Sequence, residues 1–376
     1  MIPFNQAHRS ERELAYVRQA LESGPVSGDG PFGRRAEKLL GELLGGARVL
    51  LTTSCTHALE ASALLLGVEP GDEVILPAFT FVSTANAFVL RGAKPVFVDV
   101  REDTLNFDER LLEAKITPRT KAIVPVHYAG VGCDMDAILA VASARGIPVV
   151  EDNAHGLFGA RKGRALGTFG ALATQSFHET KNVSCGEGGA LVVNDAALVE
   201  RAEVLREKGT NRSRFFRGQV DKYTWVDVGS SWVISDVLGA LLLAQLEDRE
   251  RIQARRQEIW ARYARELATW AEREGARLPV VPVGHEHPAH LFYVLLPDLA
   301  RRTAFLQHLE GRGVKAVFHY VPLHLAPMGL RFGGRAGDCP VTESVSDRLA
   351  RLPLFTGLRP EEQDQVIDAV TSFRGG

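Results

Sequence analysis

Short apolar runs rich in β-branched residues alternate with amphipathic stretches through the first half of the chain. Apolar residues at helical spacing predict helices at 56–66, 83–91, 107–114, 135–144 and 197–207. The apolar runs predict seven strands, at 49–51, 74–76, 96–98, 122–126, 147–150, 172–175 and 190–193. Strands and helices that alternate in this way are typical of a mostly parallel sheet covered on both faces. We therefore expect an α/β fold with a seven-stranded sheet between helices.

The N-terminal segment begins with a helix and continues into a glycine-rich loop. Ser10 and Glu13 form a capping box for a helix that Ser23-Gly24-Pro25 ends. Residues 28–33 match the G-x-G-x-x-G pattern, but they follow a helix where a dinucleotide site requires a strand. Pro31 also removes a backbone donor from this turn. We predict a loop here, which argues against an NAD-dependent oxidoreductase.

The second half of the chain follows a different pattern. Between residues 212 and 225, Arg and Lys alternate with aromatic residues, and we predict a long loop of the kind that is often functional. A helical pattern from Ile234 to about Trp270 then leads into a second domain. There we predict strands at 291–296 and 314–319 and helices at 301–311, 342–350 and 360–372. The expected division is a large domain at 1–245 and a smaller C-terminal α/β domain at 246–376.

Composition and charge argue against several classes of function. Over 376 residues the formal net charge is -2, so no positive field favours nucleic acid as a partner. The N-terminus lacks a signal-peptide pattern, and the apolar run from Leu59 to Val68 is far shorter than the roughly 20 residues that span a bilayer. The four cysteines form no CxxC pair, so we expect reduced thiols and a cytoplasmic protein. His285, His287 and His290 miss the HExxH spacing, and we expect no metal site.

Two polar runs, Glu151 to His155 and Ser176 to Asn182, carry the candidate chemistry. Each run follows a predicted strand. The ends of strands deliver side chains to the carboxyl edge of an open α/β sheet, where such folds bind their ligands. We therefore expect Asp152 and Lys181 to lie at one edge of the sheet.

A lysine and an aspartate at such an edge suit one particular cofactor. A lysine amine forms an imine with an aldehyde, and pyridoxal phosphate is the aldehyde cofactor that needs one. An aspartate beside the ring nitrogen keeps it protonated, because an opposite charge favours the charged form. Lys181 and Asp152 fit these two roles. A simple salt bridge is the ordinary alternative, but Lys181 lies among hydroxyls and before the glycine-rich run at 185–189.

On these residues the chain resembles the DegT/DnrJ-type sugar aminotransferases, which are pyridoxal phosphate enzymes of fold type I. The resemblance extends over nearly the whole chain and includes the runs at 176–182 and 207–213. Family members that dehydrate or deoxygenate sugars have histidine in place of Lys181, so the lysine implies transamination. A non-catalytic regulatory protein on this fold would be expected to lose Lys181 or Asp152, and both are present.

The resemblance also implies which residues hold the cofactor. Ser54 is a good N-cap for the helix at 56–66, and free amides at a helix N-terminus bind anions, although a capping serine is common without a ligand. By resemblance, Phe81 stacks on the pyridine ring, His155 lies near its 3′-hydroxyl, and Ser231 reaches the phosphate of the partner subunit in a homodimer. Core packing of Phe81 and a structural role for His155 are the alternatives. The expected phosphate contacts are Ser54, Cys55, Thr56 and Ser176.

Basic residues of the predicted loop suit the diphosphate of a nucleotide sugar, since the arginine fork matches phosphate oxygens. A charged run is usually a solvated loop, but the similarity to the family along this stretch favours binding. The resemblance implies further sugar contacts from the smaller domain. The expected substrate residues are Arg212, Arg214, Lys222 and Tyr223 from the loop, and His319, Tyr320 and His324 from the smaller domain.

Within the family, the resemblance is greatest to the transaminases that form dTDP-4-amino-4,6-dideoxygalactose. It implies that L-glutamate donates the amino group and leaves as 2-oxoglutarate. The C4 ketone of dTDP-4-dehydro-6-deoxy-D-glucose is then the expected acceptor. Another nucleotide-linked keto sugar, or transfer at C3, is the open alternative.

Overall fold

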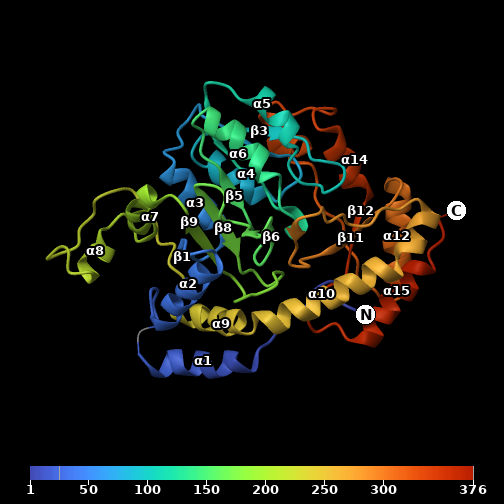
Figure 1. Ribbon diagram of the computed structural model, residues 1–376, viewed down its shortest axis with the longest axis horizontal. Helices are drawn as coiled ribbons and strands as arrows, with labels where there is room; N and C mark the ends of the chain where they lie inside the picture. The colour runs from blue at the N-terminus through green and yellow to red at the C-terminus, as the bar shows by residue number, and fades with distance from the viewer. Residues whose placement is uncertain (25, 376) are drawn as a thin grey trace.

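The computed structural model of the protein describes residues 1–24 and 26–375, and a central sheet organises its first half (Figure 1). Four strands have the order β1–β9–β8–β5, and three more have the order β3–β2–β4. Parallel bridges from Ile123 to Val149 and from Val126 to Asp152 join β4 to β5, so the strands form one sheet of seven. The seven are β1 (Arg48–Thr52), β2 (Glu73–Pro77), β3 (Lys94–Val98), β4 (Thr120–Ile123), β5 (Val150–Asp152), β8 (Leu172–Ser176) and β9 (Gly189–Val193).

The sheet is mostly parallel, as the sequence predicts. β9 runs antiparallel to both of its neighbours, β1 and β8. The pairs β5–β8, β2–β3 and β2–β4 are parallel. The six strands other than β9 therefore share one direction, and their carboxyl ends lie at one edge of the sheet.

Helices cover both faces of this sheet, because successive strand residues point to opposite sides. Leu50 and Leu191 pack on one face, in a core with residues of α3, α4 and α7. Val49 and Ala190 pack on the other face, in a core with residues of α2 and α9. The covering helices are α2 (Pro31–Leu43), α3 (Cys55–Leu65), α4 (Val82–Val89), α6 (Met135–Ala144), α7 (Val199–Arg206) and α9 (Asp236–Glu247).

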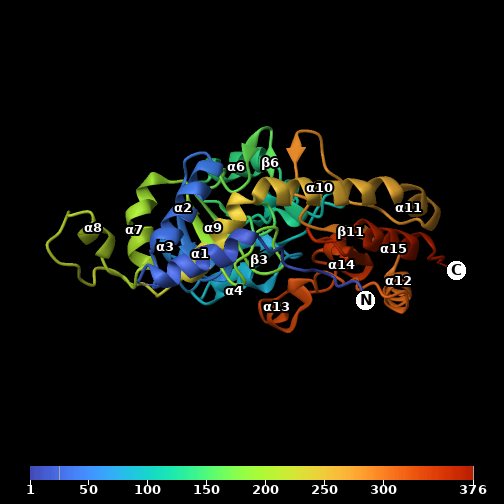
Figure 2. The ribbon, with the colours of Figure 1, turned by 90° about the horizontal axis from the view of Figure 1, so that it is seen from below.

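The C-terminal region has its own core around a two-stranded antiparallel pair, β11 and β12. Tyr263, Trp270, Phe292 and Phe305 are fully or almost fully buried in this core. Ile2 also packs there, so the N-terminal end lies with the C-terminal region, as Figures 1 and 2 show. The elements are α10 (Arg249–Glu266), α11 (Ala268–Glu274), β11 (Phe292–Leu295), α12 (Leu299–Gly311), α13 (Pro327–Arg331), α14 (Pro340–Arg348), β12 (Leu349–Leu352) and α15 (Pro360–Thr371).

Shorter elements complete the chain. The N-terminal helix α1 has the predicted capping box at Ser10, and Pro25 of the predicted stop lies outside the described residues. The domain boundary at 245 stays a prediction, and it falls inside α9. The remaining elements are α1 (Glu11–Glu22), α5 (Leu112–Lys115), β6 (Ala160–Arg161), β7 (Arg164–Ala165), α8 (Arg212–Phe216) and β10 (His285–Glu286).

Several predicted elements differ from the structure. The loop predicted at 28–33 becomes helical at Pro31, where a proline is tolerated in the first turn of α2. The loop predicted at 212–225 contains the short helix α8, and the long helix predicted from Ile234 to Trp270 is divided into α9, α10 and α11. The segment 314–319 makes single bridges at Val314 and Val317 and is not a strand.

Two further predicted helices differ from the structure. The helix predicted at 342–350 ends at Arg348, and its last residues belong to β12 instead. The helix predicted at 107–114 is a 3-10 turn at 109–111 followed by α5.

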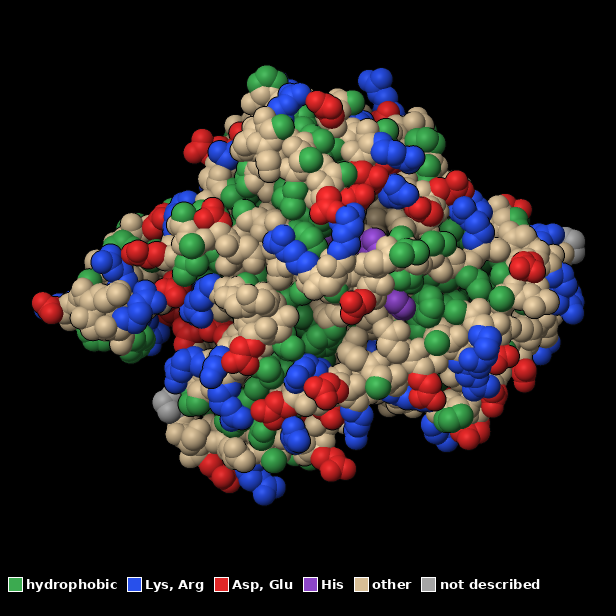
Figure 3. Space-filling view, viewed as in Figure 1, with side chains coloured by type: hydrophobic (Ala, Val, Ile, Leu, Met, Phe, Trp, Pro, Cys, Tyr) green, Lys and Arg blue, Asp and Glu red, His purple; other side chains and the backbone are tan. Residues whose placement is uncertain are grey.

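The described part of the chain contains no helix that is both long and apolar enough to cross a membrane. Acidic and basic side chains are interspersed over the face shown in Figure 3, in keeping with the small net charge.

Candidate active site

A cavity of about 820 Å³ lies at the carboxyl edge of the sheet and is closed on its other side by the C-terminal region. Asp152 at the end of β5, Ser176 at the end of β8 and Ser54 just after β1 line its sheet side. His290 and Arg351 line it from the C-terminal region. This is the edge at which open α/β folds place their ligands.

Asp152 is held firmly in this cavity. Its Oδ2 accepts a hydrogen bond from the Thr84 hydroxyl at 2.7 Å, and its Oδ1 accepts one from the Ala154 amide at 3.2 Å. Thr84 shares a further hydrogen bond with the Thr80 hydroxyl at 2.8 Å. The hydrogen bonds from Thr84 and Ala154 fix the direction of the Asp152 carboxylate at the end of β5.

Lys181 lies in the same cavity, in the turn after β8. Its backbone amide donates to the His178 carbonyl at 2.9 Å, which fixes the turn. Within the described residues its amine has no hydrogen-bond partner. Burial lowers the pKa of Lys181 to about 8; attraction to Cys55 and Asp152 opposes the shift and the charge of Arg351 adds to it. A lysine with such a pKa has a reactive neutral fraction at ordinary pH.

The start of α3 forms an anion-binding end of the cavity. The Ser54 side chain caps the helix by accepting from the His57 amide at 3.1 Å. The amides of Cys55 and Thr56 have no acceptor within the described residues, and both residues line the cavity. A helix N-terminus with free amides attracts anions. Ser176 also lines this end, so the predicted phosphate contacts are brought together.

Aromatic rings enclose the space between these groups. Phe81 is 57% exposed and lines the cavity, which disfavours the alternative of a core phenylalanine. The His155 ring stacks on His290 with centroids 4.3 Å apart, and its Nδ1 is buried without a partner in the described chain. Burial, with the charges of Lys181 and Arg351, holds the pKa of His155 well below its usual value. His155 is therefore neutral and keeps a free ring nitrogen.

The structure brings two of the three predicted C-terminal residues to the cavity. His319 and Tyr320 line it, with their rings 3.4 Å apart. His324 does not line the cavity, contrary to the position expected from the sequence. Its side chain is fully buried and its Nε2 bonds to Glu343 at 2.9 Å, so it fastens the segment before α13 to α14.

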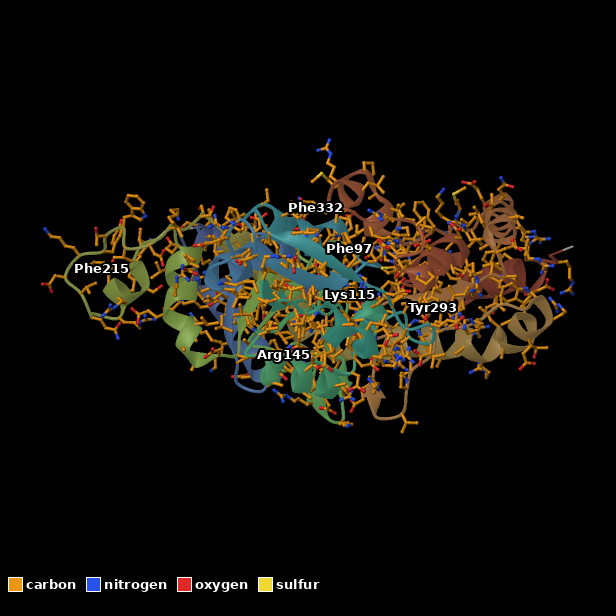
Figure 4. The ribbon with its side chains drawn as sticks, turned by 90° about the horizontal axis from the view of Figure 1, so that it is seen from above. Phe97, Lys115, Arg145, Phe215, Tyr293 and Phe332 are labelled. Carbon is orange, nitrogen blue, oxygen red and sulfur yellow. The ribbon has the colours of Figure 1, made fainter. Side chains whose placement is uncertain are left out.

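The predicted residues between 207 and 231 lie away from this cavity in the same chain. Their segment carries α8 and projects from the body of the protein, as Figure 1 shows and as the position of Phe215 in Figure 4 confirms. Arg212 is paired with Glu207 at 2.7 Å and Arg214 with Glu200 at 3.2 Å. The residues that the structure does not bring to the cavity of their own chain are Arg212, Arg214, Lys222, Tyr223 and Ser231.

Sequence reasoning missed three residues of the cavity. Thr84 orients Asp152, and its signal was its place in the helix after β2, beside Phe81. His290 bonds through Nδ1 to the Asn182 side chain at 2.9 Å, next to Lys181. Arg351 carried no sequence signal, because it lies in a short apolar strand with no motif.

The comparisons with known proteins agree with this geometry. Residues 7–371 match the model of the DegT/DnrJ/EryC1/StrS aminotransferase family. The chain belongs to this family. The spore coat polysaccharide biosynthesis protein SpsC of Bacillus subtilis (strain 168) is 36% identical over 384 residues, which cover 100% of this chain and 97% of SpsC.

Two solved structures resemble this aminotransferase closely. The aminotransferase TlmJ from Streptoalloteichus hindustanus has a TM-score of 0.90 and 36% identity, covering 99% of this chain and 98% of TlmJ. Spr1654 from Streptococcus pneumoniae in its PMP form has a TM-score of 0.92 and 28% identity, covering 99% of this chain and 98% of Spr1654. It is also known in a PLP form. These findings confirm the predicted fold class and the predicted enzyme class, a sugar aminotransferase.

Pyridoxal phosphate is the cofactor of this aminotransferase, as the sequence predicts. The cavity fits it, since two unpaired amides at α3 suit a phosphate and Asp152 suits a protonated ring nitrogen. Among the described residues, no three His, Cys, Asp or Glu side chains are placed to hold a metal ion.

Proposed function

We propose that this aminotransferase moves the amino group of L-glutamate to C4 of dTDP-4-dehydro-6-deoxy-D-glucose. The products would be dTDP-4-amino-4,6-dideoxy-D-galactose, a precursor for lipopolysaccharide or another polysaccharide, and 2-oxoglutarate. The observation that carries the reaction type is the amine of Lys181, with its lowered pKa, in one cavity with Asp152 and the free amides of α3. The runs at 176–182 and 207–213 support the choice of sugar, and SpsC supports a role in polysaccharide formation.

In this proposal each residue of the cavity has one task. The Cys55 and Thr56 amides hold the cofactor phosphate, with the hydroxyls of Ser54, Thr56 and Ser176 beside it. Phe81 covers one face of the ring. Asp152, fixed by Thr84, faces the ring nitrogen, and neutral His155 offers its free Nδ1 to the ring hydroxyl.

Lys181 moves the proton. When bound, pyridoxal phosphate supplies an electrophilic aldehyde carbon and an electron sink. With the cofactor in place, the neutral Nζ of Lys181 would take the proton from the α-carbon of the amino donor, and the resulting ammonium would deliver that proton to the carbon that was the cofactor's aldehyde carbon. A pKa of about 8 suits both directions, because each form is populated near neutral pH.

The projecting segment at 207–231 supports a homodimer. It exposes apolar side chains, including Phe216 at 69% and Trp225 at 78%, and such patches on a soluble surface mark interaction sites. In a dimer this segment would bring Arg212, Lys222 and Ser231 to the cavity of the partner subunit. The four cysteines are all free thiols, which supports the proposed location in the cytoplasm.

Another nucleotide-linked keto sugar is the second candidate. Related structures include Helicobacter pylori PseC, an aminotransferase involved in the biosynthesis of pseudoaminic acid, at 25% identity. Transfer at C3 belongs to the same alternative. Both share the chemistry of Lys181 and differ in the acceptor.

Product analysis separates these candidates. Purified protein with pyridoxal phosphate is incubated with L-glutamate and dTDP-4-dehydro-6-deoxy-D-glucose, and the product is identified by mass spectrometry and NMR. The proposal predicts an axial amine at C4 of a galacto-configured sugar. Amination of a different keto sugar, with none of this one, would overturn the proposed substrate and leave the enzyme class in place.

A further inference from the structure

Arg351 is a cation that lines the cavity and contacts none of the groups that suit the cofactor. It lies in β12, opposite Tyr293 of β11. Its backbone amide donates to the Val317 carbonyl at 2.7 Å, and its carbonyl accepts from the Val317 amide at 3.2 Å. The backbone is thus fixed on both sides, and its side chain lines the cavity.

The guanidinium of Arg351 is poorly satisfied. Its Nη2 donates to the Phe318 carbonyl at 3.1 Å, and its Cζ lies 4.6 Å from the centre of the Phe4 ring. Its Nε is buried and has no acceptor among the described residues. No carboxylate of the described chain forms an ion pair with it. A guanidinium carries five N–H donors, so most of its capacity is unused.

Two fully buried arginines of this protein, Arg206 and Arg256, have their charge or their donors satisfied. Arg206 pairs with Asp29 at 2.6 Å and Glu37 at 2.9 Å. The guanidinium of Arg256 donates to three backbone carbonyls, at 289, 290 and 354. Arg351 is half-buried, and a cation that lines a cavity without such partners is a candidate for ligand binding.

The charges that face Arg351 point to an anionic ligand. Asp152 is engaged by Thr84 and Ala154, and the other carboxylate of the cavity, Glu187, is exposed beside His178. His155, His290 and His319 are neutral, because burial holds the pKa of each well below its usual value. The charge of Arg351 also contributes to the lowered pKa values of Lys181 and His155, which agrees with a position near both.

We propose that Arg351 binds a carboxylate of the amino-acid donor. The inference rests on the proposed function, in which donor and sugar use the same cavity in turn. The α-carboxylate of an amino acid is one bond from the carbon that Lys181 deprotonates, so its cation must lie near Lys181. A diphosphate is separated from the reacting carbon by the sugar ring. The planar fork of an arginine matches a carboxylate with two parallel hydrogen bonds.

To test this, the two half-reactions are measured separately in the variants Arg351→Gln and Arg351→Lys. Conversion of the bound cofactor by L-glutamate is followed by absorbance, and the concentration for half-maximal rate is determined. We expect this concentration to rise about ten-fold or more in Arg351→Gln, with partial recovery in Arg351→Lys, because a charge-assisted bond is lost. Arg331→Gln is the matched control, since exposed Arg331 loses the same charge outside the cavity.

The second half-reaction supplies the decisive comparison. Each variant, carrying the cofactor in its amine form, is mixed with the keto sugar. The sugar concentration that gives half of the maximal rate is expected to stay within about two-fold of the value for the unmodified protein. Unchanged melting temperature and unchanged borohydride fixation of the cofactor show that each variant is folded and loaded. The same experiment is done with L-glutamine as the donor. If Arg351→Gln raises the required concentration of both donors equally, Arg351 binds the α-carboxylate. If it raises that of L-glutamate alone, Arg351 binds the side-chain carboxylate.

Two results would overturn the inference. One is an Arg351→Gln protein with unchanged dependence on L-glutamate, and the other is an effect confined to the nucleotide sugar, which would assign Arg351 to the diphosphate. Failure of the proposed sugar looks different, because the half-reaction with L-glutamate then proceeds while that keto sugar is not aminated. A protein that reacts with no amino acid would end both proposals.

Discussion

Lys181 shows how burial prepares a single residue for chemistry. An exposed lysine keeps a pKa near 10.4 and is almost entirely protonated at neutral pH. In this cavity the cost of burying the charge outweighs the attraction of Asp152, and the pKa falls to about 8. The neutral amine, which is the nucleophile, is therefore available near physiological pH.

This shift predicts the pH dependence of cofactor capture. The rate at which cofactor-free protein binds pyridoxal phosphate covalently should rise with pH through a midpoint of about 8, because the neutral amine attacks the aldehyde. Stopped-flow absorbance between pH 6 and 10 measures this, in steps of about half a unit. A midpoint near the ordinary lysine value of about 10.4 would show that the amine is not desolvated.

The same shift predicts a stability effect with a definite sign. The folded pKa of Lys181 lies below its unfolded value, so the unfolded chain binds more protons between these two values, and stability rises with pH there. Below about pH 8 the buried amine is charged, and the full cost of burying this charge lowers the stability of the folded protein. Lys181→Met should therefore raise the melting temperature of cofactor-free protein at pH 7, whereas Lys38→Met, at an exposed site, should not. A lower melting temperature for Lys181→Met alone would show that the buried amine does not destabilise the folded protein.

At the scale of elements, the junction of β9 with α3 shapes the anion-binding end. Gly189 begins β9 directly against the start of α3. A Cβ at this position would lie 2.3 Å from the Cys55 amide nitrogen and 2.3 Å from the Ser54 carbonyl carbon. Backbone atoms cannot give way as a flexible side chain does. The glycine therefore permits the close approach that aims the amides of Cys55 and Thr56 into the cavity.

Gly189→Ala should weaken cofactor binding more than it weakens the fold. We expect the dissociation constant for pyridoxal phosphate to rise about ten-fold, with a loss of about 1–3 kcal/mol in stability from overpacking. Fluorescence titration measures the dissociation constant, and thermal melting measures the stability. Gly311→Ala is the control, because nothing lies within 4 Å of a Cβ built there. Equal cofactor affinity in both variants would show that this junction does not shape the phosphate site.

The sequence predicted those elements whose apolar pattern is local. All seven strands of the main sheet were found, since each is a short buried run of its own. The segment 314–319 was predicted as a strand because it is apolar, but its partners are single residues far away in the chain, Ile2 and Arg351. β12 was missed because its apolar residues continue the helical spacing of α14.

The site was predictable where a motif carried it. Lys181, Asp152 and the start of α3 lie in recognisable runs after strands, and the structure brings them into one cavity. Arg351 and His290 are single residues without a motif, and they reach the cavity through the packing of the C-terminal region against the sheet. No local pattern could reveal that packing.

At the scale of the whole molecule, the projecting segment at 207–231 predicts that one subunit completes the site of another. A protein with Lys181→Ala and a protein with Arg212→Glu and Lys222→Glu should each be almost inactive. Mixed under conditions that exchange subunits, they should recover part of the activity, because one cavity in a mixed dimer then has both an intact lysine and an intact partner segment. Light scattering gives the oligomeric state of each. No recovery despite mixed dimers would show that the segment serves its own subunit or none.

Reduction with borohydride shows whether Lys181 carries the cofactor, on which the proposed chemistry depends. The loaded protein is reduced, digested and analysed by mass spectrometry to locate the phosphopyridoxyl group. We expect this group on Lys181 in the unmodified protein. In Lys181→Ala we expect the group to be absent and turnover to fall at least about a hundred-fold. A phosphopyridoxyl group on another lysine, or retained turnover in Lys181→Ala, would contradict this role of Lys181.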